Sequence, residues 1–416
     1  MQKTELLPYL KTALRFYNSD QLNFDSDLLK LFGLEENPFD PALLRRYFSK
    51  WAPRPHLQAE YLPKFETSKN VNLLLHANLT RIDLNSTLDQ VQKIEFVNNE
   101  GKKFSLEMKK LVLCMGGIEN ARILLANTRQ IPQGIGNQHD LLGRFFQDHT
   151  QLMAGFLKPE DEKKLQEHCF ERTHNGLLYT PKFSLNFEKQ RQEKLLNLSA
   201  TIWPGNPDTI LPRRVLSNIR RLRFTTSQLI SGPAFDLVQL ALKNQALQIE
   251  KCLHPSQQRI SVSIMAQQEP SPESRILLAK KRDRLGIPQS KIQWRPTVNS
   301  WRSMVRFAEI LQSQLEKSAL GKLELLPHIR QNSKHWQIFM FDSCHPIGST
   351  RMAKSPQEGV LDTDCRVFGI SNLFVLGSSS FPTGGHSNPT LTLSALAFRF
   401  FDQIIKPELE AQEKMP

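Results

Sequence analysis

The sequence predicts an α/β protein, and three stretches carry this prediction. Near the C-terminus, a strand-like run at 372–376 leads through a loop of small residues into a helix-like run at 391–405. A second apolar strand, 110–115, ends in two glycines and precedes a helix-like run at 118–127. Residues 260–265 alternate apolar and polar side chains, as a half-buried strand does. A strand that leads through a loop of small residues into a helix is typical of α/β domains.

Length and composition suit a soluble globular protein of two or three domains. Apolar residues make up 39% and charged residues 23% of the 416 residues, which excludes an extensively disordered chain. No apolar run approaches the roughly 20 residues that a membrane-spanning helix requires, so we expect no membrane span. No signal-type apolar segment follows the first residues, and the five cysteines show no metal-binding spacing. Dispersed thiols of this kind indicate a cytoplasmic protein.

The formal net charge of +13 is spread thinly along the chain, with local concentrations such as Lys280-Lys281-Arg282. Nucleic-acid binding would need basic residues interleaved with aromatic ones, and the sequence shows neither that pattern nor a known module. We therefore expect no nucleic-acid partner and interpret the charge as a solvated basic surface. Attraction to anionic substrates, membrane surfaces or an acidic partner is the alternative.

The loop from Gly377 to Thr390 is the most informative stretch of the chain. Asn388 is a favoured N-cap, and Pro389 fits the first position of the following helix. That helix would direct free N–H groups and its positive dipole end toward a ligand above the Gly384-Gly385 turn. Five of its apolar residues recur at helical spacing and are expected to face the core: Leu393, Leu396, Ala397, Phe400 and Ile404.

This loop resembles the C-terminal signature of the glucose–methanol–choline (GMC) oxidoreductases, flavoenzymes that oxidise alcohols and sugars. A second block at 344–352, followed by residues 359–362, is similar to another part of that family, and residues 142–149 resemble a third. The resemblance implies a small alcohol or sugar as substrate and FAD as cofactor.

The fold that the resemblance implies is a partial FAD-binding, Rossmann-like domain with an inserted α+β substrate domain built on an antiparallel sheet. Residues 1–150 and 340–416 would form the FAD-binding part, and residues 151–339 the substrate-binding domain. Within the first part, we expect helices and loops over 1–65 and a strand at 71–75.

Two residues stand where the family keeps its catalytic pair. Hydride transfer from an alcohol needs a base for the hydroxyl proton and a donor for the developing alkoxide. The resemblance assigns the first role to His345 and the second to Asn388. In the alternative interpretation, His345 is a hydrogen-bonded structural histidine and Asn388 is only an N-cap. His386 is not required by the motif, and it either lines the pocket or is exposed.

The resemblance also implies cofactor contacts at both strand ends. The stretch His76–Leu79 would lie beside the adenine, and Gly116-Gly117 would approach the dinucleotide. Gly377 and Ser378 would contact the flavin, and Pro389 and Thr390 would lie beside its pyrimidine ring, where the Thr390 N–H could bond it. A strand followed by two glycines and a helix also occurs in α/β proteins that bind no cofactor.

The sequence departs from the family at the FAD pyrophosphate. The GxGxxG turn that cradles this group is absent, and Gly134-Ile135-Gly136 lacks the third glycine and a preceding buried strand. The chain would then be part of a split or truncated oxidoreductase that works with a separate N-terminal FAD-binding chain. The alternatives are a non-catalytic homologue that binds a ligand or partner, a flavoenzyme with a different phosphate site, and a carbohydrate-binding or scaffold protein. In the first case, apolar edges near 110–115 and 372–376 would be exposed.

Overall fold

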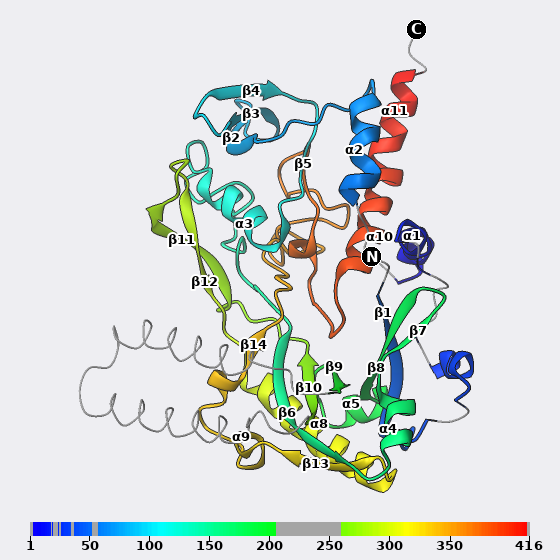
Figure 1. Cartoon of the computed structure of the whole chain (residues 1–416). Coiled ribbons are helices and arrows are strands. Elements are labelled where there is room, and N and C mark those ends of the chain that lie inside the picture. Colours follow the sequence, from blue (N-terminus) through cyan, green and yellow to red (C-terminus); the bar gives the residue numbers. More distant parts are fainter. Residues whose placement is uncertain are drawn as a thin grey trace, which may run out of the picture.

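The computed structural model of the chain describes residues 3–17, 19, 24, 26–34, 37–51, 57–204 and 259–413. In Figure 1 a large sheet occupies the lower half of the molecule, and smaller sheets with their helices occupy the upper half. The mixed α/β fold with an antiparallel sheet that the sequence predicts is confirmed.

The large sheet is antiparallel throughout. Its main path runs through β1 (Leu44–Trp51), β8 (Leu177–Leu185), β9 (Leu198–Trp203), β10 (Ile260–Ala266), β6 (Thr150–Pro159) and β13 (Gly321–Leu325). Two short strands extend it, β7 (Arg172–His174) beside β8 and β14 (Phe341–Asp342) beside β6. The segment 1–65, expected to be helices and loops, therefore contributes a strand, because Tyr47 and its neighbours pair with β8 in full register.

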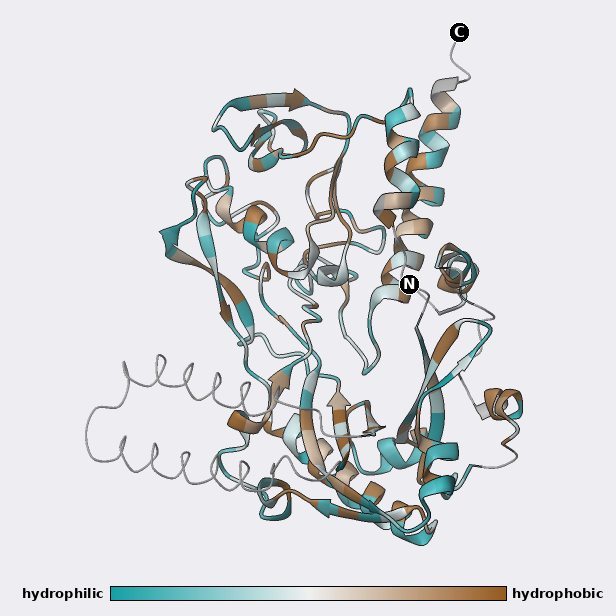
Figure 2. Cartoon of the chain, in the orientation of Figure 1, coloured by the Kyte–Doolittle hydropathy of each residue, from teal (hydrophilic) through white to brown (hydrophobic). Residues whose placement is uncertain are grey.

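One face of this sheet forms the larger hydrophobic core. Phe183, Ala200, Ile264 and Leu152 lie side by side across four adjacent strands and are fully buried. Helix α8 (Val298–Lys317) covers them with buried residues at helical spacing, among them Trp301, Met304, Phe307, Leu311 and Leu315. Figure 2 shows hydrophobic and hydrophilic residues interleaved along these strands and along α8.

The opposite face of the same strands is polar. Because side chains alternate along a strand, the residues between the core positions all point away from α8. They include Tyr47, Lys182, Ser199, Thr201, Ser263 and Gln151. This polar face is turned toward the loop that precedes helix α10 (Thr390–Phe400), which descends between the two halves in Figure 1.

The upper half is organised around two short parallel strands, β5 (Leu111–Leu113) and β15 (Leu373–Val375). Strand β5 leads directly into α3 (Gly116–Ala126), as the sequence predicts, whereas β15 leads into a short 3₁₀ turn, η3 (Ser378–Ser380), before the loop to α10. Beside them lie the sheet β2 (Asn78–Leu84), β3 (Val91–Val97) and β4 (Lys103–Glu107), and the hairpin β11 (Arg275–Arg282) and β12 (Pro288–Gln293).

The remaining elements are short or peripheral. They are α1 (Lys3–Phe16), η1 (Ser26–Phe32), α2 (Leu57–Thr67), α4 (Glu162–Cys169), α5 (Phe187–Gln192), α9 (Pro327–Arg330), η2 (Trp336–Phe339), the π-helical η4 (Phe401–Ile405) and α11 (Lys406–Glu413). Helix α1 packs along α10, where the Tyr17 hydroxyl lies 2.9 Å from the Ser394 hydroxyl. Among the described residues, no helix combines the length and the apolar character that a bilayer crossing requires.

Two sequence predictions in this half are wrong. Residues 71–75 form no strand, and Leu74 and Leu75 are 60% and 67% exposed, because no described strand lies beside them to pair with. Ala397 faces solvent although it was expected in the core. Of the other four residues expected there, Leu396 and Phe400 are buried, and Leu393 and Ile404 pack against them.

A buried asparagine joins the ends of the two parallel strands. Asn120 Oδ1 accepts the Met115 N–H at 2.9 Å, and Asn120 Nδ2 donates to Leu376 O at 3.2 Å and to Ser379 Oγ at 3.0 Å. The first bond lies after β5 and the other two lie after β15. Asn120 therefore fixes the spacing of both turns that follow these strands.

We predict that Asn120→Ala lowers the free energy of unfolding by about 2 kcal/mol, because it leaves buried partners without hydrogen bonds. Glu119→Ala, on the exposed side of the same helix, is the control and should change stability by about 0.5 kcal/mol or less. Chemical denaturation of both variants measures the difference. Equal stability of the two variants would show that Asn120 does not hold the strand ends together.

Candidate active site

The glycine turns that follow β5 and β15 lie side by side, as expected if both contact one cofactor. A Cβ built on Gly377 would stand 3.8 Å from Gly116 Cα. Gly116 adopts a φ of +79°, and a Cβ there would meet nothing within 4 Å, so this turn presents open backbone to its surroundings. Gly117 differs, because its Cβ would lie 2.2 Å from the Pro346 carbonyl oxygen.

The segment 346–349 is held between these two turns by hydroxyl groups. Ser378 Oγ donates to the Pro346 carbonyl and Ser349 Oγ donates to the Gly117 carbonyl, both at 2.6 Å. These contacts position the residue immediately before the segment, His345. The structure therefore brings together the Gly116-Gly117 turn, the block 344–352 and the loop that begins at Gly377.

The backbone of His345 is fixed by a buried carboxylate. Asp148 Oδ1 and Oδ2 accept the His345 N–H at 3.0 and 3.1 Å, and Oδ1 also accepts the Ser343 N–H at 3.0 Å. Burial raises the pKa of Asp148 to about 6, against the opposite effect of these hydrogen bonds. Between the two anchored residues, Cys344 adopts the left-handed region at a φ of +59°, a conformation that non-glycine residues seldom adopt.

The ring of His345 contacts a second histidine. Its Nδ1 lies 3.1 Å from Nδ1 of His149, which is buried just before strand β6. The other ring nitrogen of His149, Nε2, lies 3.3 Å from the Gly384 carbonyl oxygen. Burial lowers the pKa of His149 to about 4, so this ring is neutral at physiological pH and carries one proton.

This geometry determines where the protons are. A carbonyl oxygen only accepts, so the His149 proton resides on Nε2 and its Nδ1 is an acceptor. The Nδ1 of His345 must then donate, which leaves Nε2 of His345 with its lone pair. Burial, and secondarily the charge of Lys182, also lower the pKa of His345 below the ordinary histidine value. At neutral pH, His345 is therefore an uncharged base with a free nitrogen.

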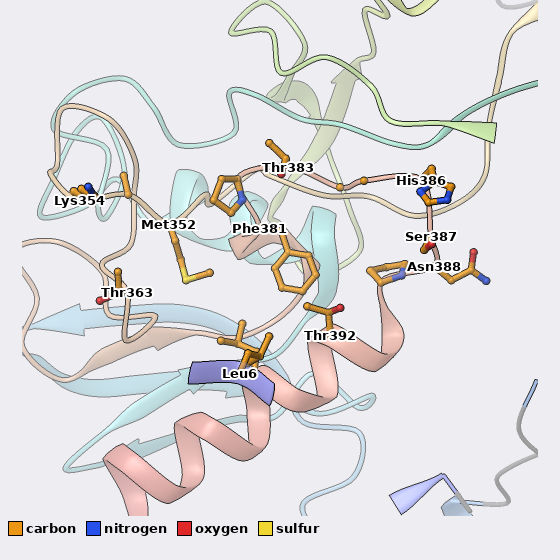
Figure 3. A pocket seen from close by; sticks show the side chains of 16 residues that line it. Leu6, Met352, Lys354, Thr363, Phe381, Thr383, His386, Ser387, Asn388 and Thr392 are labelled. Carbon is orange, nitrogen blue, oxygen red and sulfur yellow. The ribbon is translucent and has the colours of Figure 1, made fainter. Parts of the chain in front are cut away.

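A cavity of about 510 Å³ lies over the start of helix α10. In Figure 3, the apolar residues Leu6, Met352 and Phe381 lie toward one end of it, and His386, Ser387 and Asn388 gather at the other. His386 thus lines this cavity, and its Nε2 is hydrogen-bonded to the hydroxyl of Tyr47 on the polar sheet face. His345 is not part of the cavity lining.

The prediction that Asn388 caps helix α10 is wrong. The N-cap is Pro389, whose carbonyl accepts the Leu393 N–H at 2.9 Å, and no side chain caps this helix end. The N–H groups of the first turn, Thr390 included, therefore have no side-chain partner at the helix start. Asn388 is exposed at the cavity, and its amide bonds to no other described residue. The carbonyl oxygen and the NH₂ group of the Asn388 side chain are thus both available to a ligand.

Leu79 and the turn Gly134-Ile135-Gly136 contribute to packing. Leu79 lies in β2, half-buried against a core cluster that includes Ile82 and Val91, with Phe96 as its strand partner. Gly134-Ile135-Gly136 is buried, and a Cβ on Gly136 would stand 2.6 Å from Val367 Cγ1. This glycine pair therefore packs against the core and forms no phosphate-binding turn.

Sequence reasoning missed Asp148, His149, Tyr47 and Lys182. Asp148 and His149 end the block 142–149, so two polar residues directly before a buried strand were the available signal. Lys182 stands in a strand whose neighbours are mostly apolar or hydroxyl-bearing, which marks a buried charge. Their proximity to His345 comes from strand pairing, which a single sequence does not show.

Comparison with known proteins connects these features to one family. Residues 270–397, which include His345 and Asn388, match the family model described as GMC oxidoreductase. The fructose dehydrogenase large subunit of Gluconobacter japonicus is 24% identical over 334 residues, which are 76% of this chain and 51% of that protein. Cholesterol oxidase of Acinetobacter baumannii is 39% identical over 71 residues, 17% of this chain and 13% of that protein.

Solved structures show the same fold. An FAD-dependent oxidoreductase from Chaetomium thermophilum superposes with a TM-score of 0.53 at 15% identity, covering 86% of this chain and 65% of that one. Pyridoxine 4-oxidase from Mesorbium loti gives a TM-score of 0.53 at 15% identity, covering 87% and 64%. This chain spans about half the length of the fructose dehydrogenase subunit that it matches. Residues 270–397 therefore belong to the GMC oxidoreductase domain family, and the chain shares the fold of these two solved oxidoreductases.

Proposed function

We propose that this chain carries the catalytic residues of an FAD-dependent oxidoreductase that oxidises the CH–OH group of a small alcohol or sugar. The observation that carries the proposal is the contact between His149 and His345, which leaves His345 Nε2 free and uncharged. The names of the relatives, fructose dehydrogenase and cholesterol oxidase among them, support a substrate with a hydroxyl group.

The residues at the strand ends fit a flavin. Gly116 offers open backbone beside Gly377, and the helix start at Pro389 and Thr390 offers N–H groups without a side-chain cap. An electron-rich ring placed there would meet hydrogen-bond donors and the positive end of the α10 dipole. We assign Gly116, Gly377, Ser378, Pro389 and Thr390 to cofactor contact. Gly117 supports the turn by packing on Pro346.

When bound, FAD would supply the hydride acceptor for oxidation of the carbinol carbon. In the proposed reaction, His345 Nε2 takes the hydroxyl proton of the substrate. The amide of Asn388 donates to the oxygen as its negative charge develops, without titrating. His149 keeps His345 in the productive tautomer, and the Asp148 carboxylate holds the His345 backbone in place.

We further propose that another chain supplies the pyrophosphate site. No glycine turn in the described part of the chain has the GxGxxG spacing of a dinucleotide-binding loop, and the exposed residues Val71, Leu73, Leu74 and Leu75 suit burial by an added structural unit. In the described part of the chain, strand β5 also pairs only with β15, so its other edge is open to a further strand.

The purified 416-residue chain should retain far less than one FAD per chain after incubation with FAD and gel filtration. Without a phosphate cradle, the remaining contacts reach only part of the cofactor. The visible absorption of the protein fraction measures the ratio. Retention of one FAD per chain would contradict the proposal of a separate phosphate-binding chain.

In the flavin-loaded holoenzyme, His345→Ala should lower turnover about 10²–10⁴-fold, because proton abstraction loses its base. His335→Ala, which removes an exposed histidine, is the matched control and should leave turnover unchanged. Anaerobic loss of the flavin's visible absorption after mixing with substrate measures the rate. Near-normal turnover of His345→Ala would exclude His345 as the base.

A further inference from the structure

Lys182 is a buried cation for which the described residues provide no counterion. It lies in the middle of β8 and is 7% exposed. Neither a hydrogen bond nor an ion pair links its ammonium group to another described residue. Burial lowers the pKa of Lys182 to about 8, so the side chain is still mostly charged at neutral pH. A buried charge without a partner is costly, and proteins keep one mainly where a ligand completes the pair.

The position of Lys182 places this charge at the candidate active site. Tyr47 is its direct partner across β1 and β8, so both side chains lie on the polar face of the sheet. The Tyr47 hydroxyl is hydrogen-bonded to His386, which lines the cavity. The charge of Lys182 lowers the pKa of His149, His345 and His386 alike, so it lies within electrostatic reach of all three rings.

The groups that face Lys182 carry no negative charge. The three imidazoles are neutral at physiological pH, and burial raises the pKa of Tyr47 far above neutrality, which keeps its phenol protonated. Arg45, on the same face two residues before Tyr47, adds a second cation that also lowers the pKa of His386. The nearby carboxylate of Asp148 is committed to the backbone N–H groups of Ser343 and His345. The site therefore has an excess of positive charge.

We propose that Lys182 binds an anionic group, a carboxylate or a phosphate, on the substrate, so that this enzyme oxidises hydroxy acids or sugar phosphates in preference to neutral alcohols. This proposal about the substrate depends on the alcohol oxidation proposed above. The lysine stands on the substrate-facing sheet and not at the strand ends assigned to the cofactor, which favours the substrate as the source of the anion. Its charge would fix one end of the substrate while His345 acts on a hydroxyl group.

Calorimetric titration of the purified chain tests this without any turnover. D-Gluconate and D-glucose 6-phosphate are the anionic probes, and D-glucitol is the uncharged probe of the same carbon number. At least one anionic probe should bind measurably tighter than D-glucitol. Lys182→Met should weaken that binding about 10-fold or more, as loss of a charge-assisted hydrogen bond does. Lys182→Arg should retain most of it.

Lys322→Met, on strand β13 of the same sheet, is the control and removes an exposed lysine. Loss of an unpaired buried charge should leave the thermal midpoint of Lys182→Met equal or higher, which separates lost binding from lost folding. Equal binding of all three probes, or unchanged anion binding in Lys182→Met, would overturn the inference. In the holoenzyme, oxidation of D-glucitol as fast as both anionic probes would also overturn it, while leaving the proposed alcohol oxidation intact.

Discussion

The alternation of side chains along the strands of the large sheet is the constraint on which this structure depends. Phe183 and Lys182 are neighbours in β8, yet the first lies in the core beneath α8 and the second faces the candidate active site. Strand β8 thus serves two purposes at once. A register shift of one residue would bury Lys182 in the core and expose Phe183, so folding and site assembly are set by the same strand pairing.

The candidate site also requires that three segments distant in the sequence be held rigidly beside one another. Asn120 joins the ends of β5 and β15, and the Ser378 and Ser349 hydroxyls hold the segment after His345 between the two turns. The histidine ring is then oriented by His149, which in turn bonds the Gly384 carbonyl. A chain of ordinary neutral hydrogen bonds, in a site that water only partly reaches, is sufficient to select one tautomer.

Local patterns in the sequence predicted the local structure well. The strand–glycine–helix units around 110–127 and 372–405 and the alternating strand at 260–265 are present. The predictions failed where the outcome depends on distant partners. Residues 71–75 have strand-forming side chains but no neighbouring strand, and Asn388 has the side chain of an N-cap but stands one residue before the cap.

In the candidate site, too, local sequence patterns predicted some residues, and the others depend on contacts between distant segments. His345 could be predicted because it stands in a recognisable block, whereas His149 and Lys182 reach it only through the pairing of β6, β8 and β1. The partnership of Tyr47 and His386 joins residues 339 positions apart in the chain. A contact between residues so far apart in the chain leaves no local pattern in a single sequence.

We infer that His345 is held as a neutral base with its proton on Nδ1. NMR of isotope-labelled imidazole nitrogens at neutral pH tests it most directly, with His345→Ala used to assign the signals. We predict a neutral ring with a protonated Nδ1 and a bare Nε2 that takes up its proton only below the ordinary histidine pKa. A proton on Nε2, or a charged ring at neutral pH, would contradict it.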